Sequence, residues 1–241
     1  MTHAPDIPFT SELLSLETLK TWSLIATVLG DLDADRISGR ELWSLLEPLG
    51  VRPEAMRVAL HRLKKDEWIA SERTGREVEY FLSERGAAET LAAHADIYRQ
   101  EVKYGGRWLL VILGPEQPDF QQPHVAIEKN VLLVPESTPL APDVVRTCPP
   151  LEMPHWFETL LVPEHMLHQA ERVAALASAF LNNPSSDRTS GRLLLLHRWR
   201  KMALRTGTWA HIELKPDGVM ADCHSAMCNV FRQTPRITPL T

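Results

Sequence analysis

The chain has 241 residues, of which 44% are hydrophobic and 24% charged, and its formal net charge at pH 7 is -5. This length and composition can supply two ordinary hydrophobic cores and give no indication of disorder. No apolar stretch approaches the roughly 20 residues that span a bilayer. The first ten residues lack the basic and apolar regions of a secretory signal, so we expect a cytoplasmic protein without a membrane segment.

Cysteine and histidine usage argues against disulfides and metals. The cysteines, Cys148, Cys223 and Cys228, form neither an even set nor a C-x-x-C motif, which is typical of reduced thiols in a cytosol. His165 and His168, or Cys223 and Cys228, could begin a zinc site, but neither pair has a matching second half at a zinc-type spacing. We therefore predict no metal and no cofactor.

The N-terminal segment is predicted to be an arm followed by a helix. Residues 1–16 resemble a loosely held arm. From residue 17 or 18 onwards the apolar residues recur with a helical period, and Gly30 and Asp31 end the helix. Asp31, Asp33 and Asp35 have the spacing with which a calcium loop begins, but Arg36 occupies its obligatory glycine position, so we predict a polar turn.

The next fifty residues have the order of a winged helix-turn-helix. Ser38 and Glu41 form an S-x-x-E capping box that begins a helix, and this helix ends at Pro48-Leu49-Gly50. A second helix begins at Pro53 and has one apolar face, formed by Met56, Ala59, Leu60 and Leu63. Residues 68–73 and 77–82 flank a Gly-containing turn and predict a β-hairpin. Two helices joined by a turn and followed by a hairpin predict a DNA-binding winged helix.

The second of these helices carries concentrated positive charge. Between Arg52 and Lys65 there are five Lys/Arg against one acid, Glu54. A solvated basic face is the ordinary alternative, but the winged-helix order favours insertion into the major groove. The candidate DNA-binding residues lie on this helix and at the hairpin tip: Arg52, Arg57, Val58, His61, Arg62, Lys64, Lys65, Arg73 and Arg76. Residues 17–95 carry eleven Lys/Arg and fourteen Asp/Glu, so we expect a focused, salt-dependent contact.

The middle of the chain is predicted to be a small sheet with Pro-rich loops. Ser83 can cap a helix that reaches residues 97–98 and serves as a connector or a dimer contact. Gly105 and Gly106 mark a joint, and the apolar run 107–113 is typical of a strand buried on both faces. Residues 125–134 and 157–162 predict two further strand regions.

The last part of the chain is predicted to be helical. One helix begins at Pro163, and another spans 191–204, with Leu193–Leu196 apolar all round and therefore buried. A short helix is expected over 221–231. The fold class is thus α+β, with three domains: a winged helix-turn-helix over 17–98, a small central α/β sheet domain over 99–162 and a C-terminal helical effector or dimerisation domain over 163–241.

With these segments placed, the chain resembles the PaaX family of bacterial transcriptional regulators, which respond to phenylacetyl-CoA. Three stretches carry the resemblance, and together they span most of residues 18–205: Met56-Arg57-Val58-Ala59-Leu60-His61-Arg62-Leu63, Gly106-Arg107-Trp108-Leu109-Leu110-Val111-Ile112-Leu113 and Arg192-Leu193-Leu194-Leu195-Leu196-His197-Arg198-Trp199-Arg200. The resemblance implies an N-terminal operator-binding winged helix, a small α/β domain and a C-terminal helical domain that senses an acyl-CoA and forms the dimer.

By position, Arg57 and Arg62 match arginines of the family's recognition helix, whereas His61 stands where the family often has a small polar residue. Two departures lie in the effector half: Gly114-Pro115 follows the first central strand, where the family often has an acid, and the tail after Arg205 lacks the family's Pro-rich, Trp-containing ending. The resemblance therefore supports operator binding more strongly than it supports the identity of the ligand.

A second basic segment is the candidate effector site. Residues 183–205 carry six Lys/Arg against one acid, and arginine and lysine are suitable receptors for the phosphates of a CoA thioester. The candidate residues are Arg192, His197, Arg198, Trp199, Arg200 and Lys201. The alternative, that these side chains solvate a helix and pair with acids elsewhere, stays open.

The sequence thus predicts a ligand-responsive repressor that binds double-stranded operator DNA as a homodimer and is released by an acyl-CoA or a related aromatic acid. The alternative is a metal-dependent nuclease built on the central sheet, because a compact sheet of this kind also resembles small CRISPR-associated nucleases. Those enzymes need a carboxylate just after the first strand, where this chain has Gly114, and no catalytic motif is recognisable. We therefore predict that the protein is not an enzyme.

Overall fold

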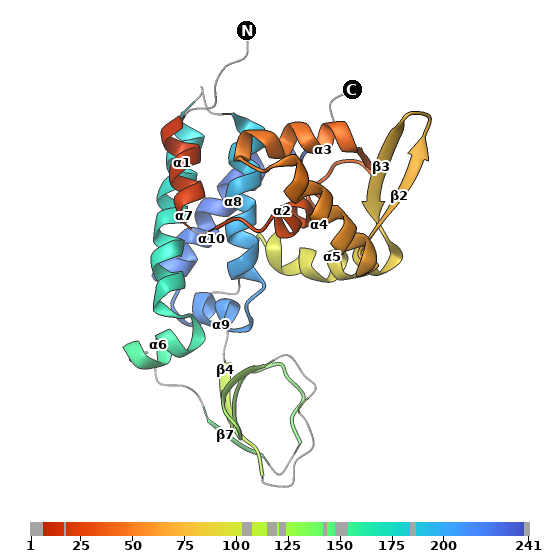
Figure 1. Cartoon of the computed structure of the whole chain (residues 1–241). Helices are drawn as coiled ribbons and strands as arrows, with labels where there is room; N and C mark the ends of the chain where they lie inside the picture. Colours follow the sequence, from red (N-terminus) through yellow and green to blue (C-terminus); the bar gives the residue numbers. More distant parts are fainter. Residues whose placement is uncertain are drawn as a thin grey trace.

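The computed structural model confirms the α+β class: helices form most of the molecule, and two antiparallel sheets accompany them (Figure 1). The sheet at the bottom of the view in Figure 1 lies below the helical body and contacts it through residues such as Trp108, whose indole donates to Glu213 at 2.8 Å. The structure describes residues 7–16, 18–102, 108–114, 120, 124–141, 144–147, 154–183 and 187–238.

The N-terminal part has the element order that the sequence predicted. In chain order its elements are α2 (Thr21–Gly30), β1 (Ile37–Ser38), α3 (Gly39–Leu46), the 3-10 helix η1 (Glu47–Leu49), α4 (Pro53–Lys65), β2 (Ile69–Thr74), β3 (Glu77–Leu82) and α5 (Glu84–Ile97). The capping box is formed, since the Ser38 hydroxyl accepts a hydrogen bond from the Glu41 amide and the Glu41 carboxylate accepts one from the Ser38 amide. Gly50, with φ of 77°, makes the turn into α4.

These strands form a three-stranded antiparallel sheet in the order β1-β3-β2. The hairpin between β2 and β3 is closed at Gly75, whose φ of 65° lies in the left-handed region that favours glycine. The Ser83 hydroxyl accepts a hydrogen bond from the Gly86 amide and caps α5, as predicted. The short strand β1, which pairs with β3, was not predicted.

The small sheet differs from the prediction in its strands. It is antiparallel, in the order β5-β6-β4-β7, and consists of β4 (Trp108–Ile112), β5 (Val125–Glu128), β6 (Val131–Pro135) and β7 (Val145–Thr147). The expectation that β4 is buried on both faces is wrong, because Val111 is buried whereas Ile112 is 45% exposed. Arg107, the two glycines before it and Cys148 lie outside the described residues.

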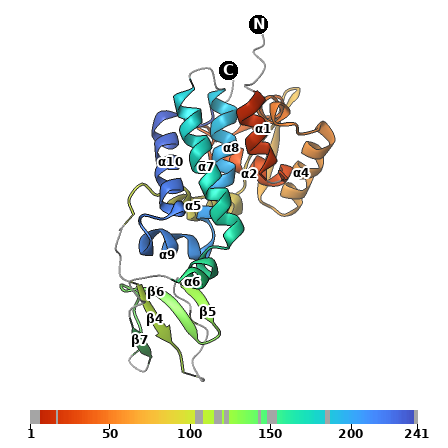
Figure 2. The same cartoon turned by 90° about the vertical axis from the view of Figure 1, so that its left-hand side faces the viewer.

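The remaining helices are α1 (Ile7–Ser15), α6 (His155–Leu161), α7 (Glu164–Asn182), α8 (Arg188–Ala203), α9 (Thr206–Leu214) and α10 (Val219–Gln233). Figures 1 and 2 show α1, α7, α8 and α10 side by side in a bundle, with α9 and α6 at its lower end. The small sheet continues below α6 and α9.

Three predictions for these segments need correction. The N-terminal segment includes α1, and Leu13 of that helix is fully buried against α7 and α8. Residues 157–162 begin within a helix, because Phe157 and Leu161, four residues apart, bury one face of α6. Helix α9 was not predicted at all, whereas α10 confirms the expected C-terminal helix and extends it at both ends.

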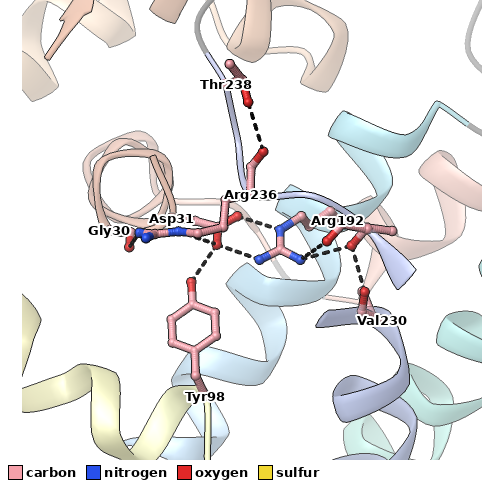
Figure 3. A network of polar contacts seen from close by, with 8 residues as sticks. Gly30, Asp31, Tyr98, Arg192, Val230, Arg236 and Thr238 are labelled. Carbon is pink, nitrogen blue, oxygen red and sulfur yellow. Dashed lines mark hydrogen bonds and ion pairs between the residues drawn. The ribbon is translucent and has the colours of Figure 1, made fainter. Parts of the chain in front are cut away.

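One continuous core joins the predicted DNA-binding part to the C-terminal helices. Buried side chains of α2 and α8 belong to the same cluster, which includes Leu24, Val28, Leu193 and Leu196. A polar network crosses this junction (Figure 3). At its centre Asp31, which directly follows α2, is fully buried and forms a two-pronged ion pair with Arg192 of α8, with N–O distances of 2.6 and 2.7 Å.

Further hydrogen bonds satisfy the remaining groups of this pair. The Tyr98 hydroxyl donates to the Asp31 carboxylate at 2.7 Å, and Arg192 Nη1 donates to the carbonyl and the hydroxyl of Thr234, after α10. Burial, together with the neighbouring Asp31 carboxylate, raises the pKa of Tyr98, so its hydroxyl stays a donor. The Asp31 carbonyl accepts from the Ile237 amide at 3.0 Å. Four segments of the chain therefore meet around Asp31 and Arg192.

We predict that Arg192→Met lowers the free energy of unfolding by about 3–5 kcal/mol, because it removes the buried cation of the Asp31 carboxylate and leaves only Arg236, which lies 3.9 Å away and is 44% exposed. The double variant Asp31→Asn/Arg192→Met should be less destabilised than the sum of the two single variants, since it removes both charges. Urea denaturation followed by circular dichroism measures all three.

The matched control is Arg172→Met, which breaks the exposed pair between Arg172 and Glu12, whose side chains are about half exposed. This change should cost less than about 1 kcal/mol. A loss for Arg192→Met no larger than that for the control would contradict a structural role of the buried pair.

Candidate nucleic-acid interface

Helix α4 has one buried and one exposed face. Met56, Ala59, Leu60 and Leu63 are buried, as the helical period predicted. Pro53 occupies the first turn, where its missing amide hydrogen leaves no helical bond unmade. The opposite face is exposed, and the side chain of Val58 at its centre is 70% exposed. The helix is thus anchored on one side and presents the other to solvent.

The structure leaves every predicted DNA-binding residue exposed. Arg52 lies just before α4, six of these residues lie on α4, and two arginines lie in the hairpin. The exposed set is Arg52, Arg57, Val58, His61, Arg62, Lys64, Lys65, Arg73 and Arg76. The hairpin projects from the body next to the N-terminal helices (Figure 1). The prediction that these residues contact DNA is not tested by their exposure.

Local contacts orient some of these cations. Arg57 lies 3.5 Å from Glu54 and Arg62 lies 3.7 Å from Asp66, both as exposed pairs within α4 or at its end. The Arg62 guanidinium also lies over the Trp22 ring of α2, 5.4 Å from its centre. Exposed ion pairs of this kind are worth about 0–1 kcal/mol, so either arginine can exchange its acid for a phosphate at low cost.

A hydrogen bond connects α4 to the hairpin. The Lys64 ammonium donates to the Ser71 hydroxyl of β2 at 2.7 Å. At the hairpin tip, Arg73 Nε donates to the carbonyl of Gly75 at 3.3 Å, which holds the arginine close to the turn. The positions of the hairpin and the helix are therefore coupled.

The acidic residues of the hairpin are paired with arginines that were not among the predicted site residues. Arg36 lies 3.0 Å from Glu72 and 3.1 Å from Glu79, and Arg40 lies 3.3 Å from Glu77. The hydrogen bond from Arg36 holds the pKa of the Glu79 carboxyl below its ordinary value. In the sequence, the only indication of a role for Arg36 and Arg40 was their position just before α3 and within its first turn. These pairs offset the local excess of acids near α4.

The predicted effector cluster on α8 needs correction, because that helix is buried on nearly all sides. Four of the six candidate side chains lie in the core, each at most 4% exposed: Arg192, His197, Arg198 and Trp199. Each of these side chains is buried and has at least one polar partner inside the protein, so the four do not form an exposed receptor for CoA phosphates. Arg200 and Lys201 are partly exposed.

The buried members instead hold other segments to α8. His197 Nδ1 lies 3.0 Å from the Thr27 hydroxyl of α2, and the Trp199 indole donates to the Ile97 carbonyl at the end of α5 at 2.7 Å. Arg198 donates to the carbonyl of Leu13 in α1 at 2.7 Å. The polar residues of this motif therefore orient three N-terminal helices against α8.

The structure adds no support to a metal-dependent reaction at the small sheet. Gly114 follows β4, and within the described parts of the chain no three His, Cys, Asp or Glu side chains are grouped as a metal site would require. Over those same residues no helix has both the length and the apolar character needed to cross a bilayer.

Comparison with known proteins identifies the N-terminal region. Residues 20–86 match the family model described as PaaX-like protein. Over 96 residues the chain is 40% identical to the transcriptional repressor PaaX of Escherichia coli (strain K12), an alignment that covers 37% of this chain and 30% of that protein. Among solved structures, the uncharacterized protein Rv0674 from Mycobacterium tuberculosis aligns with a TM-score of 0.43 and 15% identity, covering 89% of this chain and 97% of that one. The matches agree with the resemblance that the sequence predicted, and they place it in residues 20–86, here called the PaaX-like region; the chain spans about 30% of the length of the curated relative that it matches.

Proposed function

We propose that this protein is a transcriptional repressor that binds duplex DNA with α4 in the major groove and the β2–β3 hairpin on the neighbouring backbone. The observation that carries the proposal is the exposed arc of α4, on which Val58 is surrounded by long basic side chains while the opposite face is buried. The similarity of residues 20–86 to PaaX-like proteins supports the same function.

The chemistry of this arc suits base edges and phosphates. Arginine can donate two hydrogen bonds to a guanine edge, and an exposed valine can pack on the methyl group of thymine. Arg57 and His61 lie one turn apart on α4, on either side of Val58 in the sequence. Lys64, held at β2 by Ser71, and the arginines of the hairpin are placed for phosphates, which fix register but carry no sequence information.

The proposal includes a homodimer and an effector. A two-fold symmetric pair would place two copies of α4 about 34–36 Å apart, one turn of DNA. An acyl-CoA or aromatic acid would release the operator only by binding more tightly to a conformation in which that spacing is lost. Because the described surface of α8 offers no cluster of free phosphate receptors, the effector site must be sought elsewhere in the molecule.

The first test reverses charge on α4. We expect Arg57→Glu/Arg62→Glu to weaken binding to a duplex selected by the wild-type protein from a randomised pool by at least about 100-fold, because each lost contact is worth about 1–3 kcal/mol. Fluorescence anisotropy at fixed salt measures this change.

The matched control, Lys129→Glu/Arg146→Glu, makes the same charge change at two exposed positions of the small sheet, far along the chain from α4. It should leave the affinity within about threefold, since distant charges are screened over about 10 Å at 0.1 M salt. Equal affinities of the α4 variant and the wild type would refute the proposed docking.

The second test concerns the hairpin. If Arg73 and Arg76 neutralise one phosphate each, the Arg73→Gln/Arg76→Gln variant should reduce the slope of log K against log salt by about 1.8, because each phosphate contact contributes about 0.9. The affinity should fall for selected and unselected duplexes alike. An unchanged slope would remove the hairpin from the interface while leaving α4 in it.

A further inference from the structure

A cavity of about 200 Å³ lies where the N-terminal part meets α8. Its walls come mainly from α2, α5 and α8, together with Trp68 and Leu204, and most of them are apolar: they include Ala26, Ala93, Ile97 and Leu196. One cationic side chain, Arg200 of α8, also lines it. An apolar cavity with few polar groups is the usual form of a small-molecule site in a protein.

Arg200 combines partial burial with the lack of an acidic partner. Within the described part of the chain no carboxylate forms an ion pair with it, whereas Arg192, two turns earlier in α8, has Asp31. Desolvation by burial lowers the pKa of Arg200, with only a smaller opposing effect from Tyr98. A guanidinium without a carboxylate partner offers N–H donors in the geometry that matches the carboxylate of a ligand.

The other titratable groups of the cavity do not neutralise Arg200. Glu89 also lines the cavity, but one of its oxygens accepts from Arg85 at 2.8 Å and the other from the Trp68 indole at 3.1 Å. Burial lowers the pKa of His94, whose ring lies 4.3 Å from that of Tyr98, so His94 is neutral at pH 7. The cavity therefore has one unmatched positive charge.

We propose that this cavity binds a small organic monocarboxylate, whose carboxylate pairs with Arg200 and whose apolar body fills the space between α5 and α8. The volume sets the size of that body, because a cavity of about 150 Å³ holds one benzene molecule. The present cavity therefore accommodates one six-membered ring, or an aliphatic group of similar size, together with the carboxylate. The nucleotide of a CoA thioester exceeds this space several times over.

The position of the cavity links the ligand to regulation, and this part of the inference rests on the proposed function. Tyr98 lines the cavity and also donates its hydroxyl to Asp31, at the junction of α2 and α8. A ligand between α5 and α8 would therefore be sensitive to the relative placement of the N-terminal and C-terminal helices. A difference in affinity between two such placements is what an effector needs.

Isothermal titration calorimetry of the full chain with benzoate, cyclohexanecarboxylate and the neutral isostere benzamide tests the ligand class. We expect both carboxylates to bind with one site per chain, and benzamide to bind at least tenfold more weakly. Arg200→Met should lower carboxylate affinity at least tenfold and leave that of benzamide unchanged. This variant should fold, because no acid loses its partner, and its melting temperature is measured alongside.

Two further variants separate the cavity from general charge effects. Arg205→Met makes the same substitution at an exposed arginine that does not line this cavity, and it should bind carboxylates like the wild type. Ala93→Leu fills the cavity from α5 and should weaken carboxylates and benzamide alike. Failure of both carboxylates to bind, equal binding by Arg200→Met, or binding of benzoyl-CoA in preference to benzoate would each overturn the proposal.

Adding benzoate to the anisotropy assay with the selected duplex distinguishes the two proposals. If the wild-type protein selects no duplex but binds benzoate through Arg200, the DNA-binding proposal fails and the ligand site stands. If DNA binds through α4 and benzoate does not bind, the reverse holds. If both DNA and benzoate bind, saturating benzoate should weaken the DNA complex of the wild type and of Arg205→Met, but not that of Arg200→Met. An equal response of all three proteins would refute the regulatory link.

Discussion

The arrangement of this molecule depends on the buried ion pair between Asp31 and Arg192. A carboxylate removed from water is tolerable only when a cation and further donors satisfy its oxygens. Here those donors come from α8 and from Tyr98 at the end of α5, while Arg192 also binds Thr234 after α10 (Figure 3). Segments far apart in the sequence must meet for the charges to be satisfied, so the pair fixes how the PaaX-like region sits on the C-terminal helices. The orientation of α4 relative to the rest of the chain is a consequence of that junction.

Sequence patterns predicted the PaaX-like region because its structure is determined locally. The side chains of Ser38 and Glu41 each accept a hydrogen bond from the other residue's backbone amide and so cap α3. The apolar positions of α4 recur with the period of an α-helix. Gly75 allows the tight hairpin turn. Each of these features involves residues fewer than ten positions apart, so neither the fold of the remaining chain nor a partner is needed to recognise them. The contacts of α4 with DNA, by contrast, remain a prediction.

The effector half was harder to predict because its contacts are distant in sequence. A run of cations over 188–205 looks like a receptor only while its partners are unknown, and the partner of Arg192 lies 161 residues away. Yet the run Leu193–Leu196 was correctly expected to be buried on all sides, and a helix buried all round must also bury its polar residues. The strand prediction for residues 157–162 was wrong for another reason: a short apolar run fits a strand or a helical turn equally well.

The position of Arg200 follows from the same helix. Arg192 and Arg200 are two turns apart, and both belong to a helix whose polar side chains must find partners inside the protein. For Arg192 that partner is a carboxylate of the chain, and its satisfied charge contributes to the junction of α2 and α8. For Arg200 the corresponding place is a cavity next to the same junction, which Tyr98 also lines. A ligand carboxylate would form an ion pair with Arg200 as Asp31 does with Arg192. Ligand binding and the packing of the PaaX-like region would then depend on neighbouring contacts of α8.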